Sequence, residues 1–290
     1  MEVKTFAEQL LYTTVRIETE TGNVKGCGTG FIVVYPVKDY QQPFIVTNKH
    51  VVSGMMEGSF HFATQKKDVD GPDVGAGYKL RVGPDFHRIW TGHPDPDVDV
   101  AVTPLIPALK RAEKDQVELF YRGIGSELFA DDGVTDSLDA LEEVVFVGYP
   151  NGVWDSKNGT PVIRKGITAT PVNLDFQNTP TFLIDASVFP GSSGSPVLLY
   201  NAGSYVDKKT GTRKEGNRLM LLGIVAEVLI RRDVNNVEFV TVPTKDIPVA
   251  ITTQMIDLGL VFKTRTIVQT IEHCLRGLEE GARQRGIVTG

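Results

Sequence analysis

Cysteine is scarce in this 290-residue chain, which holds Cys27 and Cys274 and no others. Two cysteines cannot build the disulfide framework that stabilises many small secreted domains. The first residues lack the basic and apolar regions of a signal peptide. No run approaches the ~18 apolar residues that a membrane-spanning helix needs. We therefore expect a reduced, cytoplasmic protein that makes no membrane contact.

Positive charge is also in deficit. The chain has 30 Lys and Arg against 36 Asp and Glu, which gives a net charge of −6. Proteins that bind the phosphate backbone need clustered basic residues. We therefore expect no nucleic-acid partner, and we also expect no metal and no other cofactor.

Short apolar runs separated by turns fill most of the chain. Examples are 24–35, 98–105, 144–149 and 219–230, and this pattern is typical of an all-β barrel or sandwich. The charged segment 105–122 is suited to link two halves. Over 265–283 the period changes, and four apolar residues fall on one face of a predicted helix, namely Ile267, Ile271, Leu275 and Leu278.

Ser193 lies in the turn Pro190-Gly-Ser-Ser-Gly-Ser-Pro196, directly before a buried-strand signal. A serine hydroxyl becomes a nucleophile only with a base, a group that orients the base, and donors for the oxyanion. The glycines allow a tight turn in which the amides of Gly191 and Ser193 converge on one point. Gly-Ser clusters are often plain loops, however, so the turn alone leaves both interpretations open.

His50 and Asp99 supply the other parts. A lone histidine at a strand end is more often structural than catalytic. A carboxylate that opens an apolar strand, as in Asp99-Val-Ala-Val, is usually a turn residue. If the fold brings the three residues together, Asp99 would accept the Nδ1 hydrogen of His50, and His50 would accept the proton of Ser193.

In the order His, Asp, Ser, these segments resemble the trypsin-like (chymotrypsin-fold) serine peptidases. Thr47-Asn-Lys-His50 is similar to Thr-Ala-Ala-His, and the Ser193 turn is similar to Gly-Asp-Ser-Gly-Gly-Pro. Two further segments resemble strands of that family, Cys27-Gly-Thr-Gly-Phe31 and Gly223-Ile-Val-Ala-Glu-Val228. The resemblance covers roughly residues 10–250.

The resemblance implies two six-stranded antiparallel β-barrels followed by a C-terminal helix. Residues 1–122 would form the barrel that carries His50 and Asp99, residues 123–264 the barrel that carries Ser193, and residues 265–290 the helix. The helix either caps the second barrel or contacts a partner. Ser192 replaces the aspartate that binds a newly cut N-terminus, so the chain is more similar to the HtrA-type bacterial branch, although we expect no PDZ domain.

The function implied is a serine endopeptidase that acts through His50, Asp99 and Ser193 and an acyl-enzyme, with the amides of Gly191 and Ser193 as oxyanion hole. Four residues are expected to bind the protein or peptide substrate, Ser187, Ala226, Glu227 and Val228. Ser187 lies where trypsin carries its basic-selecting aspartate, so a small or medium apolar side chain is the expected preference.

Three alternatives stay open. The chain is a catalytically silent relative that serves as a binding module, or a gated enzyme that needs a regulatory protein to order its oxyanion hole, or an esterase with the same triad.

Overall fold

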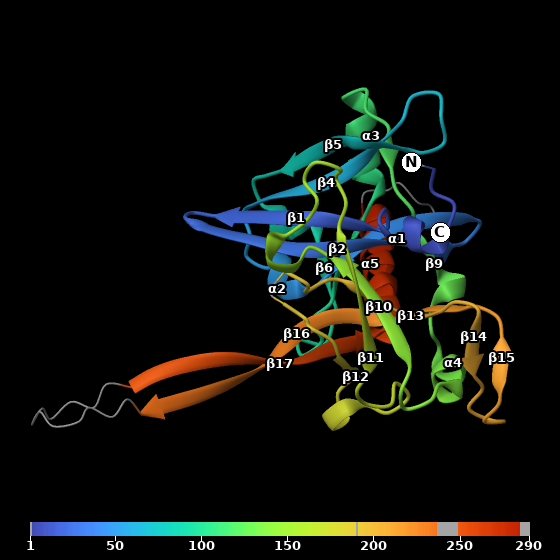
Figure 1. Cartoon of the computed structure of the whole chain (residues 1–290). Coiled ribbons are helices and arrows are strands. Elements are labelled where there is room, and N and C mark those ends of the chain that lie inside the picture. The colour runs from blue at the N-terminus through green and yellow to red at the C-terminus, as the bar shows by residue number, and fades with distance from the viewer. Residues whose placement is uncertain (1, 190, 237–248, 285–290) are drawn as a thin grey trace, which may run out of the picture.

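The computed structural model describes residues 2–189, 191–236 and 249–284. Strands dominate it, as the sequence predicts. In Figure 1 the blue and cyan strands of the first half lie above the green and orange strands of the second half. The short strands arise from alternation: Val15 and Ile17 are buried, while Arg16 and Glu18, which follow them in turn, are half-buried.

The first half is a nine-stranded sheet in the order β5-β4-β1-β2-β3-β7-β6, with β8 on β4 and β9 on β2. Its strands are β1 (Thr14–Thr21), β2 (Val24–Val37), β3 (Tyr40–Thr47), β4 (Glu57–Gln65), β5 (Pro72–Val82), β6 (Thr91–Gly92), β7 (Ala101–Pro104), β8 (Leu119–Phe120) and β9 (Ile124–Gly125). It exceeds the six strands of the resemblance because β6, β8 and β9 are two-residue pairings added to the longer strands.

The second half is the predicted closed six-stranded barrel, in the order β10-β11-β12-β17-β16-β13. Its strands are β10 (Glu143–Gly148), β11 (Val162–Thr168), β12 (Thr181–Asp185), β13 (Pro196–Asn201), β16 (Arg218–Asn236) and β17 (Val249–Lys263). A separate hairpin joins β14 (Ser204–Val206) to β15 (Arg213–Glu215). Figure 1 shows β16 and β17 running out of the barrel together as a long arm.

The helices are α1 (Phe6–Leu10), α2 (Lys49–Val52), α3 (Ile106–Lys114), α4 (Asp132–Ser137) and α5 (Thr264–Gln284). The predicted C-terminal helix is confirmed as α5, which packs against β6 and β7 of the sheet and β16 and β17 of the barrel. Ile267 and Ile271 are fully buried, but Leu278 is 53% exposed because the final turns of the helix leave the strands behind. Among the described residues no helix has the length and apolarity needed to cross a membrane.

One hydrophobic cluster joins the two halves. It combines side chains of the sheet, of the barrel and of α5, among them Phe31, Val100, Val147, Ile224 and Ile267. Two more clusters fill the barrel and the sheet separately. Shared burial fixes the halves against one another, and the loops that carry the candidate site meet at this junction.

Glu18 on β1 is the centre of a charged network on the sheet. Its carboxylate lies 2.6 Å from Lys79 Nζ, 2.9 Å from Arg16 Nη2 and 3.0 Å from His61 Nε2. Burial acts to raise the pKa of Glu18, but the hydrogen bond from Lys79 and the close contacts with His61 and Arg16 outweigh it and lower that pKa to about 2.

Replacing Glu18 with glutamine is expected to destabilise the protein by about 2 kcal/mol at pH 7. A carboxyl whose folded pKa is depressed contributes stability above its unfolded pKa and loses it as the pH falls towards the folded value. The difference should therefore shrink below the ordinary value of 4.5 and vanish near 2. Urea unfolding of both variants across this range measures it, with Glu20→Gln, an exposed position on the same strand, as the matched control. An equal loss at pH 7 and pH 3 would contradict the assignment.

Candidate active site

His50 and Asp99 form a tight pair. The Nδ1 atom of His50 lies 2.5 Å from Asp99 Oδ2, and the His50 backbone N–H donates to Asp99 Oδ1 at 3.0 Å. The imidazole side chain is 50% exposed, whereas the carboxylate is 22% exposed. One carboxylate therefore holds both the ring and the backbone of His50 and occupies Nδ1, so Nε2 is the ring nitrogen left to act on a substrate or a hydroxyl.

Sheet pairing brings these two residues together. His50 lies in α2, immediately after β3, and Asp99 lies just before β7. The two strands are antiparallel neighbours in which Thr47 opposes Ala101. The side-chain amide of Asn48 adds a hydrogen bond of 2.7 Å to the Asp99 carbonyl oxygen. Two residues far apart in the chain thus meet at one end of the strand pair.

Ser193 occupies a turn that is fixed at several points. The Gly194 N–H donates to Val225 O at 2.9 Å, and the Thr29 N–H donates to Ser193 O at 3.0 Å. Gly194 has φ of +87°, and a Cβ there would overlap the Thr29 carbonyl oxygen, so glycine is required. The Ser193 hydroxyl donates to Ala226 O at 3.1 Å, and within the described residues no hydrogen bond joins it to His50.

The predicted oxyanion amides lie in the same turn. Gly191 also has φ of +87°, and a Cβ there would lie 2.7 Å from the Tyr149 carbonyl oxygen. Neither the Gly191 nor the Ser193 N–H donates to any residue that the structure describes. Ser192 between them is buried, and its amide closes the turn onto Phe189 O at 2.9 Å.

Thr29 on β2 connects the site, and the sequence analysis missed it. Its hydroxyl donates to Gly191 O at 3.0 Å and accepts from the Tyr149 N–H at 3.1 Å. Its carbonyl oxygen accepts from the Thr47 hydroxyl at 2.7 Å. Thr29 therefore holds the Ser193 turn beside the strand that leads to His50. One feature of the sequence could have pointed to Thr29. The strand of the trypsin-like peptidases that Cys27–Phe31 resembles has glycine at this position.

The expected substrate-binding residues come from chain segments before and after Ser193 in the sequence. The pairing of β13 with β16 ends at Ile224, so the backbone of Ala226, Glu227 and Val228 has β17 on one side and no paired strand of the described chain on the other. Ser187 is an exposed residue of the loop between β12 and the Ser193 turn.

Within the described part of the chain, no group of three or more His, Cys, Asp or Glu side chains is arranged to hold a metal ion. Cys27 and Cys274 are both free thiols, and burial raises the pKa of the Cys274 thiol. The site itself presents an imidazole–carboxylate pair and the Ser193 hydroxyl.

This fold, with a strand-built half on each side of the candidate site, is that of a chymotrypsin-like peptidase. The family model for the trypsin-like peptidase domain matches residues 28–206, which is more than half of the chain. The protein belongs to this family. Among curated proteins none matches the chain.

Several solved structures are similar at low identity. The serine endoprotease from Yersinia pestis is 15% identical with a TM-score of 0.47, over 95% of this chain and 68% of that one. An inactive mutant of Rv3671c from M. tuberculosis is 17% identical with a TM-score of 0.43, over 92% and 88% of the two chains. Tobacco etch virus protease with its product is 12% identical with a TM-score of 0.42, over 79% and 73%.

Proposed function

We propose that this protein is a serine endopeptidase in which Ser193 is the nucleophile, His50 the general base and Asp99 the residue that orients it. The observation that carries the proposal is the double contact of Asp99 with His50, in a site where Thr29 joins the His50 strand to the Ser193 turn. Residues 1–122 and 123–264 would form the two catalytic lobes, with 265–290 as a helical cap.

The reaction begins with transfer of the Ser193 proton to His50 Nε2 as Oγ attacks the peptide carbonyl carbon. The amides of Gly191 and Ser193 stabilise the oxyanion, each worth about 3 kcal/mol. His50 then gives its proton to the leaving amine, and the carbonyl remains as an ester on Ser193. Water, deprotonated by His50, hydrolyses this ester and frees the acid. Asp99 keeps the ring in the tautomer that these steps need.

The open edge at Ala226–Val228 suits an extended substrate that adds a strand to β16. Ser187 provides no charge for a basic side chain, so a small or medium apolar residue on the amino side of the scissile bond is the proposed preference. A peptide-library cleavage profile tests this preference, and a profile dominated by Arg or Lys would overturn it.

The proposed nucleophile is tested with a fluorophosphonate probe, which reacts only with activated serines. Labelled protein is digested, and the modified residue is located by mass spectrometry. Labelling at Ser193 supports the proposal. If protein that cleaves casein is labelled at a different serine, the proposal is refuted. If the protein cleaves esters but not peptides, the esterase alternative is favoured.

A gated enzyme is a second candidate, because the Ser193 hydroxyl donates to Ala226 O instead of His50. In this conformation the proton must change acceptor before attack. A regulatory protein that reorders the turn would supply this change. Probe labelling that appears only after cell extract is added would establish gating, whereas equal labelling without extract would exclude it.

Thr29→Val is expected to lower kcat/KM by about ten- to a hundred-fold, because the Tyr149 N–H and Gly191 O both lose a buried hydrogen-bond partner. Thr29→Ser retains the hydroxyl and should retain most of the activity. Peptide hydrolysis by both variants measures the effect, with circular dichroism to confirm folding. Equal activity of the two variants would show that the hydroxyl does not position the turn.

A further inference from the structure

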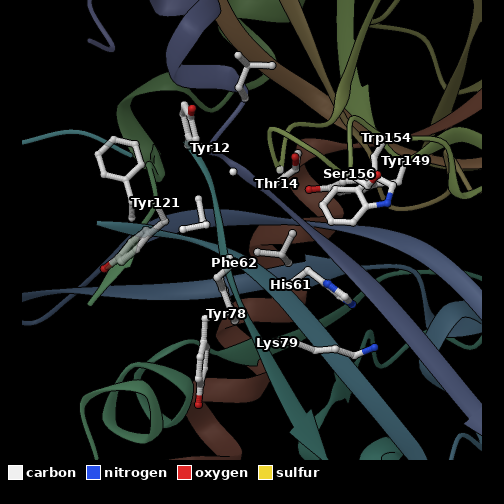
Figure 2. A pocket seen from close by; sticks show the side chains of 18 residues that line it. Tyr12, Thr14, His61, Phe62, Tyr78, Lys79, Tyr121, Tyr149, Trp154 and Ser156 are labelled. Carbon is white, nitrogen blue, oxygen red and sulfur yellow. The ribbon is translucent and has the colours of Figure 1, made fainter. Parts of the chain in front are cut away.

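A partly enclosed cavity of about 200 Å³ lies away from Ser193, between the sheet and the segment 149–159. Strands β1, β4 and β5 supply one wall, and the loop after β10 supplies the other. Figure 2 shows Tyr12 and Tyr121 on one side of this cavity and Tyr149 and Trp154 on the other. Aromatic side chains therefore form facing parts of the cavity wall.

Two polar side chains that line the cavity have no partner. The Tyr12 hydroxyl is buried and forms no hydrogen bond within the described chain. The Thr14 hydroxyl also has no hydrogen bond of standard geometry there, although it lies near enough to the Tyr149 phenol to act against the rise of its pKa. Tyr12 is 5% exposed and Thr14 is 6% exposed, so bulk water does not satisfy them. Leaving such groups unpaired costs free energy, which a ligand with a donor and an acceptor would recover.

The cavity favours a neutral ligand. Burial raises the pKa values of Tyr12, Tyr121 and Tyr149, so their phenols stay uncharged. Burial likewise lowers the pKa of His61. Lys79 at the rim is already paired with the Glu18 carboxylate. A charged ligand would lose its hydration here without gaining a free counter-charge.

The size of the cavity and the arrangement of its aromatic rings restrict the class of ligand further. A dry cavity of about 150 Å³ takes benzene, so this one has room for one ring and a polar group. Trp154 is held by an edge contact with Tyr149 at 6.2 Å between ring centroids and by Arg16 over its ring at 5.2 Å. A third ring would extend this arrangement with the same edge-to-face geometry.

We propose that this cavity binds a neutral, phenol-sized aromatic molecule whose hydroxyl or amide pairs with Tyr12 and Thr14, and that its occupancy alters the Ser193 turn. The coupling rests on the proposed function and on one short path. Tyr149 lines the cavity, its N–H donates to Thr29 Oγ, and the same hydroxyl donates to Gly191 O. A ligand that moves the segment 149–159 must therefore also act on the Ser193 turn.

Binding is tested on the Ser193→Ala protein, so that the result does not depend on catalysis. The probes are p-cresol and toluene, which differ by one hydroxyl, and binding is followed by calorimetry and by the Trp154 indole N–H signal in NMR. We expect p-cresol to bind with a dissociation constant of about 1 mM or tighter, and roughly tenfold tighter than toluene.

Tyr12→Phe is the matched variant, because it removes the hydroxyl and keeps the ring. The tenfold preference for p-cresol should disappear in it, while toluene binding is unchanged. No saturable shift of the Trp154 signal with either probe would overturn the site. Equal preference in the parent and in Tyr12→Phe would overturn the assigned hydrogen bond.

The coupling is tested by the rate at which the fluorophosphonate labels Ser193 in the otherwise unmodified protein. Saturating p-cresol should change that rate by threefold or more, and Tyr12→Phe should reduce the response at the same concentration. Binding without a change in rate would overturn the coupling. Absence of labelling both with and without cell extract would refute the proposed function, while the binding result on Ser193→Ala would still decide the site.

Discussion

Replacing Ser193 with alanine is expected to lower kcat/KM for peptide hydrolysis by about a million-fold, because triad residues act as one unit. The variant loses the atom proposed to form the acyl-enzyme, while the backbone contacts of the turn do not involve the hydroxyl. The Thr29 N–H bond to Ser193 O and the Gly194 N–H bond to Val225 O both persist. Folding should therefore be retained.

Hydrolysis of casein and fluorophosphonate labelling measure this loss. Ser195→Ala is the matched control, since Ser195 lies two residues away in the same turn and its buried hydroxyl has no hydrogen-bond partner in the described chain. Its activity should stay close to that of the parent. If Ser193→Ala cleaved casein as fast as the parent, and the parent resisted the probe, the assignment would be wrong.

Asp99→Asn is expected to lower kcat/KM by about ten-thousand-fold, the scale found when a triad carboxylate becomes an amide. The carboxylate accepts from both His50 Nδ1 and the His50 backbone N–H. An amide has one oxygen, so its NH₂ group must face one of these donors. Facing Nδ1, it would stabilise the tautomer with hydrogen on Nε2, which cannot accept the proton of Ser193.

Asp97→Asn is the control for Asp99→Asn, since it makes the same change on an exposed residue two positions earlier. The ratio of kcat/KM between the two variants isolates the loss of the carboxylate next to His50. Equal activities would remove Asp99 from the mechanism. The Asn48 bond to the Asp99 backbone does not depend on the side chain, so both variants should keep the loop in place.

The parts of the site that sequence could predict are those carried by local patterns. Apolar runs and turns indicated strands, and helical periodicity indicated α5. The order of His50, Asp99 and Ser193 indicated the family, which the domain match confirms. Periodicity puts Leu278 on the same helix face as the buried Ile267 and Ile271, but it does not show where the supporting strands end, and Leu278 is 53% exposed.

The rest depends on contacts between distant segments. Thr29 is an ordinary strand residue in the sequence, and its three roles appear only when β2, the Tyr149 segment and the Ser193 turn meet. The aromatic cavity is likewise assembled from four separate stretches of the chain, 11–15, 61–79, 120–121 and 149–159. Its unpaired hydroxyls on Tyr12 and Thr14 leave no trace in composition or spacing.

The bond from Thr29 to Gly191 has a consequence for how the chain is made. These residues are 162 positions apart, and they belong to different halves of the molecule. Because domains tend to form from the N-terminal end during synthesis, the first sheet leaves the ribosome long before Ser193 is made. The Ser193 turn receives its support from Thr29 only once the second barrel closes on a finished first half.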